Sequence, residues 1–268
     1  MPAPPRLRPS AARVCAPAKS SRVLLNGRAV LITGGKRIGV AIAADLVRRG
    51  MDLALCYRTS REEAETMVTT ARSVGRKAVA LQADLTRAED CASIVARTVE
   101  ALGRLDVLIN MASVYGSVDL DQIDERVWDS VVDVDLKASF LCAKAALPHL
   151  RAAGGGRIIN FADWIAASGR PRYKGYLPYY VAKRGVIGLT EALALELAGE
   201  NVLVNAIAPG PILAPAGTSD EEFASVEKAT PVGRWGGEEE IVKAVAFLLE
   251  SDYVTGETIR VDGGRHIR

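Results

Sequence analysis

The chain has 268 residues, of which 49% are apolar, 25% charged and 5% aromatic, a profile that argues against a disordered, collagen-like or coiled-coil protein. No apolar stretch approaches the roughly 18 residues of a membrane-spanning helix, and four scattered cysteines with two histidines favour neither a disulfide framework nor a metal site. The net charge of +2 combines six basic residues and no acid in residues 1–28 with 28 basic and 32 acidic residues in the remainder, so the body of the chain lacks the charge pattern of a nucleic-acid-binding protein.

The N-terminal segment, residues 1–25, is rich in proline, alanine, arginine and serine. Such a composition buries too little apolar surface to offset the entropy lost on ordering, so we expect a disordered tail. An organelle targeting segment is the alternative, because the stretch is basic and free of acid. The cysteine usage suits a reducing compartment, and we expect a cytoplasmic protein unless this tail directs import.

The remainder, residues 26–268, alternates between short apolar runs and segments of helical periodicity. The run 29–33 stops at Gly34, and helical spacing follows over 38–49 until Gly50. The same alternation continues and predicts strands at 53–57, 78–82, 107–110, 158–161, 202–207 and 258–261, and helices at 62–74, 87–102 and 179–198.

Near-continuous apolar strands that alternate with helices indicate a parallel sheet buried on both faces. Since parallel crossovers are right-handed, the helices cover both sides of such a sheet. No linker or fixed-period repeat interrupts residues 26–268. We therefore predict an α/β protein with a single Rossmann-type domain, a doubly wound parallel sheet of about seven strands.

The segment T-G-G-K-R-I-G, residues 33–39, joins the first strand to the first helix. Glycine there allows a ligand to approach the backbone closely, and a helix N-terminus presents free N–H groups to an anion. The context suits dinucleotide binding, with Gly34, Arg37, Ile38 and Gly39 as candidate contacts. The spacing departs from G-x-G-x-x-G, so a plain β–α turn is the alternative reading.

The end of the second strand bears on which dinucleotide is bound. An NAD site places an acidic residue there to bind the ribose 2′-hydroxyl. This chain has Arg58, Thr59 and Ser60 instead, and an arginine with neighbouring hydroxyls suits a 2′-phosphate. We therefore expect NADPH as the cofactor.

Tyr179 and Lys183 lie four residues apart in a helical segment and share one helix face. A tyrosine with its usual pKa near 10 is a poor catalyst at neutral pH. A nearby ammonium lowers that pKa, so the pair suits acid–base catalysis. Tyr176 and Tyr180 are less suited, because neither has a lysine four residues later.

Several segments in this order and spacing resemble one family, the short-chain dehydrogenase/reductases, over nearly all of residues 27–266. They are T-G-G-K-R-I-G at 33–39, A-D-L at 83–85, N-M-A-S at 110–113, Y-Y-V-A-K at 179–183, N-A-I-A-P-G-P-I at 205–212, P-V-G-R-W at 231–235 and T-G-E-T-I-R-V-D-G-G at 255–264.

The resemblance implies a set of roles. Tyr179 looks like the proton donor, and Lys183 both tunes it and holds the nicotinamide ribose. The remaining cofactor contacts implied by the resemblance are Asp84 and Leu85 at the adenine, Asn110 and Ala112 at its ribose, and Pro209, Gly210 and Ile212 at the nicotinamide. The family is commonly tetrameric, so the resemblance also implies a homotetramer or homodimer.

Asp163 occupies the position at which most members of this family have a catalytic serine. A serine hydroxyl donates to a developing oxyanion, whereas an ionised carboxylate repels it. Either Asp163 is protonated, or the substrate is protonated at a ring nitrogen. The chain resembles the pteridine reductases best, since they share the Asp-for-Ser exchange. This resemblance implies that Arg37, Ser113, Tyr115, Asp163 and Tyr179 contact a pterin.

We therefore expect hydride transfer from NADPH to a C=N bond of a pteridine or dihydrofolate-type small molecule, with Asp163, Tyr179 and Lys183 as catalytic residues. The alternative is a carbonyl reductase of the 3-oxoacyl-thioester or small-ketone kind. A third hypothesis is an NADPH-binding protein without turnover.

Three further features depart from the family pattern or extend it. Asp135 replaces the usual helix asparagine, which puts the family's water relay in doubt. The basic and aromatic insertion 168–178 either recognises an acidic tail of the substrate or is a solvated loop. The Pro-, Gly- and Ser-rich segment 211–225 is typical of a mobile lid over a substrate.

Overall fold

The computed structural model describes residues 25–34 and 36–267. The predicted tail, residues 1–25, lies outside the described residues apart from Leu25, which is buried. The alternatives of a disordered tail and a targeting segment therefore stay predictions.

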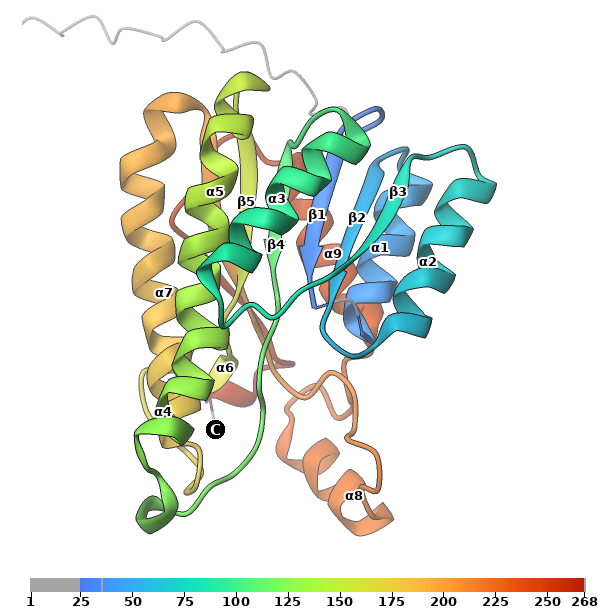
Figure 1. Cartoon of the computed structure of the whole chain (residues 1–268). Helices are drawn as coiled ribbons and strands as arrows, with labels where there is room; N and C mark the ends of the chain where they lie inside the picture. Colours follow the sequence, from blue (N-terminus) through green and yellow to red (C-terminus); the bar gives the residue numbers. More distant parts are fainter. Residues whose placement is uncertain (1–24, 35, 268) are drawn as a thin grey trace, which may run out of the picture.

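Seven parallel strands form one sheet in the order β3-β2-β1-β4-β5-β6-β7 (Figure 1). The first strand, β1, lies inside the sheet; the chain then moves outward to β3 and returns to the other side of β1 with β4. The strands are β1 (Ala29–Thr33), β2 (Asp52–Tyr57), β3 (Ala78–Gln82), β4 (Val107–Asn110), β5 (Gly156–Phe161), β6 (Val202–Pro209) and β7 (Thr258–Val261).

Helices cover both faces of this sheet, as the doubly wound prediction requires. One face packs against α1 (Ile38–Arg48), α2 (Arg61–Ser73) and α9 (Glu238–Glu250). The other face packs against α3 (Ala88–Leu102), α5 (Ala138–Ala152) and α7 (Leu177–Leu197). The shorter helices α4 (Glu125–Val132), α6 (Trp164–Ala167) and α8 (Asp220–Ala229) lie toward the carboxyl ends of the strands, where α8 projects from the body (Figure 1).

The predicted fold class and all seven predicted strands are confirmed. Three strands are longer than their apolar runs, because backbone pairing continues past them: Asp52 pairs with Ala29, Gly156 with Val202, and Pro209 with Val261. Between β4 and β5, where the sequence pattern predicts no helix, α4 and α5 are joined by a π-helical turn, Asp133–Lys137.

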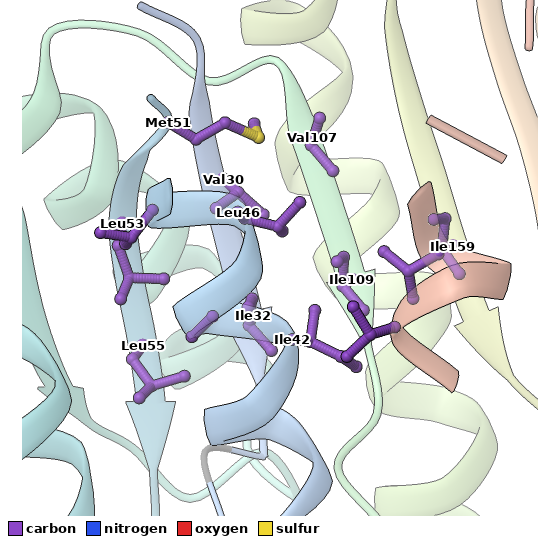
Figure 2. Close-up of a cluster of buried hydrophobic side chains, with 14 of the residues drawn as sticks. Val30, Ile32, Ile42, Leu46, Met51, Leu53, Leu55, Val107, Ile109 and Ile159 are labelled. Atoms are coloured by element: carbon purple, nitrogen blue, oxygen red, sulfur yellow. The ribbon is translucent and has the colours of Figure 1, made fainter. Parts of the chain in front are cut away.

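Branched aliphatic side chains form the core on the α1 side of the sheet (Figure 2). Ile42 and Leu46 of α1 are buried against strand residues that include Val30, Ile32 and Ile109. Removing such side chains from water contributes about 1.5–3 kcal/mol each. This packing fixes where β1 ends and α1 begins, which is where the glycine loop lies.

Because all seven strands are parallel, their carboxyl ends meet at one edge of the sheet. The connections that leave β1 and β4 there pass to opposite faces, and this switch point is where open α/β sheets bind ligands. Within residues 25–34 and 36–267, no helix is both long and apolar enough to cross a membrane.

Candidate active site

A cleft of about 740 Å³ opens at the carboxyl ends of β1, β2, β4, β5 and β6. It brings together residues that are far apart in the sequence. Of the predicted site residues, it is lined by Gly34, Arg37, Ile38, Arg58, Thr59, Ser60, Asp84, Leu85, Ala112, Ser113, Tyr115, Asp163, Pro209, Gly210 and Ile212.

The glycine loop forms one wall of this cleft. Gly34 has φ 86°, and a Cβ there would lie 3.0 Å from the Ala112 amide nitrogen. A Cβ on Gly39 would collide with the carbonyl oxygen of Gly34. The loop therefore packs closely enough that only glycine fits, which leaves its backbone open to a phosphate-bearing ligand.

Arg37 connects this loop to the opposite side of the cleft. It has φ 50° and directly precedes α1. Its Nη2 donates to the carbonyl oxygen of Ala214 at 3.0 Å, in the segment that the sequence identifies as a lid. The guanidinium thus spans the mouth of the cleft.

The β2 end of the cleft carries Arg58, Thr59 and Ser60, and no acidic residue stands at the strand end itself, residues 57–60. Asp84 follows β3, and its Oδ1 accepts hydrogen bonds from the Thr86 backbone N–H and hydroxyl. These hydrogen bonds lower the pKa of the Asp84 carboxyl. A cationic, hydroxyl-bearing end and a tight glycine cradle fit a dinucleotide with a 2′-phosphate.

The side chain of Tyr179, in the first turn of α7, contacts Asp163, which precedes the insertion 168–178 in the sequence. Its hydroxyl donates to Asp163 Oδ2 at 3.1 Å, while Asp163 Oδ1 accepts from the Ile165 backbone N–H at 2.7 Å. Asp163 thus both caps α6 and orients the tyrosine. The longer gap between these two residues is accommodated by the loop that precedes α7.

The expected lowering of the Tyr179 pKa is wrong. Burial raises the pKa of Tyr179 well above its usual value, and the charges of Asp163 and Asp135 raise it further. Burial also raises the pKa of Asp163, an effect that the Ile165 N–H, the Tyr179 hydroxyl and the charge of Lys183 oppose. Tyr179 is therefore protonated at neutral pH, which suits a proton donor rather than a base.

Lys183 lies beneath Tyr179 and is buried. Its Nζ lies 5.6 Å from the Tyr179 ring centre, donates to the Phe161 carbonyl oxygen at 2.9 Å and pairs with Asp135 Oδ1 at 3.0 Å. Asp135 comes from the π-helical turn and was not among the predicted site residues. It also accepts from the Val114 backbone N–H at 2.8 Å and from the Ser113 hydroxyl.

Tyr115 belongs to an aromatic cluster at the rim of the cleft. Its ring stacks on Tyr176 and meets Tyr179 edge-on, with ring centres 5.1 Å apart in both pairs. Burial, followed by the hydrogen bond to Tyr176, raises the pKa of Tyr115. Its side chain is still 61% exposed, which leaves surface for a substrate to contact.

Asn110 does not line the cleft. Its side chain is buried and donates to Asn160 Oδ1 at 3.0 Å and to the Ser139 carbonyl oxygen at 3.3 Å. These bonds tie β4 to β5 and α5. The structure therefore gives its side chain a structural place beneath the cleft, not one facing the expected adenosine ribose.

Gly210 directly follows β6, at the start of the predicted nicotinamide-side loop. A Cβ there would lie 2.5 Å from the Cβ of Asp262. The close approach of β6 to the segment after β7 positions Pro209 and Ile212 along the cleft.

Trp164, Tyr173 and Arg265 also line the cleft. Tyr173 is part of the insertion predicted to recognise an acidic tail or to be a solvated loop, whereas Trp164 and Arg265 were missed. Trp164 directly follows Asp163 in the sequence, which is a usable signal. Arg265 comes from the C-terminal segment, and nothing in the local sequence indicates that it reaches the site.

Comparisons with known proteins agree with this geometry. The family model described as enoyl-(acyl carrier protein) reductase matches residues 34–266. The chain is 36% identical over 245 residues to a 3-oxoacyl-[acyl-carrier-protein] reductase of Staphylococcus aureus, covering 90% of this chain and 98% of that protein. It is 38% identical over 247 residues to a short-chain reductase of Streptomyces niveus, covering 88% and 92%.

Among solved structures, a short-chain dehydrogenase of Burkholderia cenocepacia in complex with NADP superposes with a TM-score of 0.84. The two sequences are 30% identical, and the match covers 90% of this chain and 99% of the other. The chain therefore belongs to the short-chain dehydrogenase/reductase family of oxidoreductases.

Proposed function

We propose that the protein uses NADPH to reduce the ketone of a 3-oxoacyl thioester to an alcohol. The observation that carries the proposal is the Tyr179 hydroxyl, which lies 3.1 Å from Oδ2 of Asp163, a residue that lines the cleft. The similarity to the Staphylococcus aureus 3-oxoacyl reductase supports this substrate class. It favours the thioester alternative over the pteridine reading preferred from the sequence.

The residues that line the cleft support a place for the cofactor. Arg58, Thr59 and Ser60 would bind the 2′-phosphate, and the backbone around Gly34 would bind the pyrophosphate. The relative solved with NADP supports the same cofactor. When bound, NADPH supplies the hydride that the substrate carbon accepts.

Tyr179 provides the proton for the substrate oxygen. Its raised pKa keeps the hydroxyl protonated at neutral pH, and the cationic Lys183 beneath it stabilises the phenolate that forms on transfer. Asp163 replaces the family serine. When protonated, its carboxyl donates a hydrogen bond to the carbonyl oxygen as a hydroxyl would. Burial, which raises its pKa, favours that form.

Reduction of a pterin C=N bond is the second candidate. Asp163 favours it, because a carboxylate accepts hydrogen bonds from the N–H groups of a pterin without needing its own proton. Tyr115 favours it as well, since its ring is partly exposed beside Tyr179 and offers a surface on which a flat heterocycle can stack.

The test measures NADPH oxidation with acetoacetyl pantetheine, dihydrobiopterin and dihydrofolate. We expect turnover of the thioester and a loss of about 10²–10⁴-fold in the Tyr179→Phe variant, with NADPH affinity retained. Tyr253→Phe is the matched control, because Tyr253 is fully exposed. Turnover of the pterins alone would replace the first proposal by the second, and turnover of none would overturn both.

We also infer a homotetramer or homodimer assembled through α7. This helix exposes Leu177, Val181 and Leu195, the last at 85%, and exposed apolar side chains on one element favour an interface. Light scattering of the purified protein gives the number of chains directly, and a monomer would contradict the inference.

A further inference from the structure

A second hollow adjoins the cleft, and all its charged lining residues are basic. This basic pocket, of about 760 Å³, is lined by Arg170, Arg172, Lys228 and Arg265 together with Trp164 and Tyr173. No aspartate or glutamate is among the described residues that line it. Its volume is in the range of sites that bind small molecules.

Neutral partners hold Arg265 in this pocket. Its Nη1 donates to the Val226 carbonyl oxygen at 2.9 Å and to Thr230 Oγ1 at 3.2 Å, and its Nη2 lies 3.4 Å from the Tyr173 hydroxyl. Its guanidinium also lies 5.6 Å from the Trp164 ring centre. These contacts orient the guanidinium without cancelling its positive charge.

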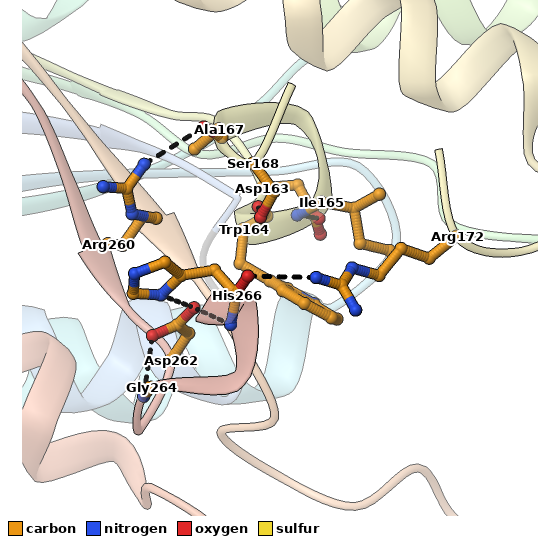
Figure 3. Close-up of polar contacts among 10 residues, drawn as sticks. All are labelled: Asp163, Trp164, Ile165, Ala167, Ser168, Arg172, Arg260, Asp262, Gly264 and His266. Carbon is orange, nitrogen blue, oxygen red and sulfur yellow. Dashed lines mark hydrogen bonds and ion pairs between the residues drawn. The ribbon is translucent and has the colours of Figure 1, made fainter. Parts of the chain in front are cut away.

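Arg172 lies against the same indole. Its guanidinium carbon is 5.2 Å from the Trp164 ring centre, and its Nη2 donates to the His266 carbonyl oxygen at 3.0 Å (Figure 3). Two guanidinium groups therefore meet at one aromatic ring. Trp164 directly follows Asp163, so this cationic surface begins one residue from the catalytic carboxyl.

The basic pocket adjoins the cleft and is separate from the predicted 2′-phosphate site. Trp164, Tyr173 and Arg265 line both hollows. Arg58 follows β2, whereas Trp164 follows β5, three strand positions away in the sheet, which corresponds to about 14 Å. A substrate whose reacting atoms lie at Tyr179 can therefore reach the basic pocket with its tail. The 2′-phosphate of the dinucleotide would lie elsewhere, at Arg58.

We propose that the basic pocket binds a phosphate or carboxylate on the tail of the substrate, so that the enzyme selects anionic substrates. The inference rests on the proposed function for the reacting end of the substrate. Arginine suits both anions, because its planar fork donates to two oxygens at once. In a 3-oxoacyl thioester the anion is the phosphate of a phosphopantetheine arm; in a dihydrofolate it is the glutamate.

The first test compares acetoacetyl-4′-phosphopantetheine with acetoacetyl pantetheine, which differ only in the phosphate. We expect KM about tenfold lower for the phosphorylated substrate. Arg170→Glu combined with Lys228→Glu should abolish that preference and leave KM for the neutral substrate unchanged. Arg170 is exposed and makes no hydrogen bond among the described residues, so its replacement leaves packing intact.

Lys174→Glu combined with Lys144→Glu is the matched control, since it changes the net charge by the same amount, and both lysines are exposed and do not line the pocket. It should retain the preference. Equal KM values for the two thioesters in the native protein would overturn the proposal. So would an equal loss of preference in the control, because the effect would then come from net charge.

A binding measurement separates this inference from the proposed function. Titration calorimetry with 4′-phosphopantetheine and pantetheine needs no turnover, and we expect the phosphorylated fragment to bind about tenfold more tightly. If neither thioester is reduced, the same comparison is made between dihydrofolate and dihydrobiopterin. A preference for dihydrofolate that the double variant abolishes would support an anion-binding pocket whose anion is a carboxylate. No preference in either pair of ligands would overturn the proposal.

Discussion

The ammonium of Lys183 lies 3.0 Å from Oδ1 of Asp135, and both side chains are buried. A family asparagine offers a neutral amide at this position, whereas this chain places a carboxylate directly against Lys183. Asp135 also binds the Ser113 hydroxyl and the Val114 N–H. It thereby links the π-helical turn, the lysine and the segment after β4.

This ion pair predicts a stability effect. Asp135→Ala strands a buried ammonium, and we expect a loss of about 3–5 kcal/mol in the free energy of unfolding, measured by urea denaturation. Asp133→Ala is the matched control on the same turn, because Asp133 pairs with Lys137 near the surface at 2.6 Å. It should cost at most about 1 kcal/mol. Similar losses in both variants would contradict the buried pair as the cause.

Asp135 should also affect the pH dependence of reduction. Its charge helps to raise the pKa of Tyr179, after burial and Asp163. Asp135→Asn removes that charge, so the pKa of Tyr179 falls. Since reduction needs the protonated tyrosine, activity should begin to decline at a lower pH on the alkaline side than in the native enzyme. The measurement is kcat against pH, and an unchanged alkaline limb would show that the charge does not reach the tyrosine.

Asp163 predicts a second pH effect, on carbonyl reduction. Burial raises the pKa of this carboxyl, and only its protonated form donates to the carbonyl oxygen. Activity on a ketone should therefore fall as the pH rises through the pKa of Asp163. Asp163→Ser supplies a hydroxyl at every pH, so its profile should lack this decline and its rate at neutral pH should rise. A profile identical to that of the native enzyme would exclude the carboxyl as the donor.

Arg58 predicts the choice between NADPH and NADH. A charge-assisted contact to the 2′-phosphate contributes about 1.5–3 kcal/mol, so Arg58→Ala should weaken NADPH binding by about tenfold or more and leave NADH binding unchanged. Arg61→Ala is the control, because Arg61 lies on the exposed face of α2, with its Nε 4.0 Å from Glu65 Oε1, and does not line the cleft. Fluorescence titration of each cofactor gives the dissociation constants.

The close packing at Gly210 predicts that a larger side chain there lowers the stability of the protein. Gly210→Ala places a Cβ 2.5 Å from the Cβ of Asp262, and relieving that overlap should cost about 1–3 kcal/mol of stability. Gly116→Ala, in the loop after β4, meets no atom within 4 Å. It should instead stabilise the protein by about 0.4–1 kcal/mol, because alanine restricts the unfolded chain more than glycine does. Thermal unfolding of the two variants should therefore shift in opposite directions.

Local sequence was sufficient to predict all seven strands and the helices α1, α2, α3 and α7. The apolar run 29–33 and the helical spacing that follows Arg37 require only neighbouring residues, so β1 and α1 could be predicted directly. The same holds for the i, i+4 relation of Tyr179 and Lys183, because one helix turn sets it. The ends of β5 and β6 could not be predicted, since pairing with neighbouring strands extends them.

By itself, then, the sequence determined the parallel sheet, the glycine loop and the Tyr179–Lys183 pair, because periodicity and spacing act over a few residues, and the family resemblance added Asp163 as a candidate. The packed chain alone decided that Asp135 meets Lys183, that Asn110 turns inward, and that the Tyr179 pKa rises. It also decided that Arg265, from the C-terminal segment, shares a pocket with Arg172. Burial and charge pairing depend on segments that meet only after folding, which no local pattern encodes.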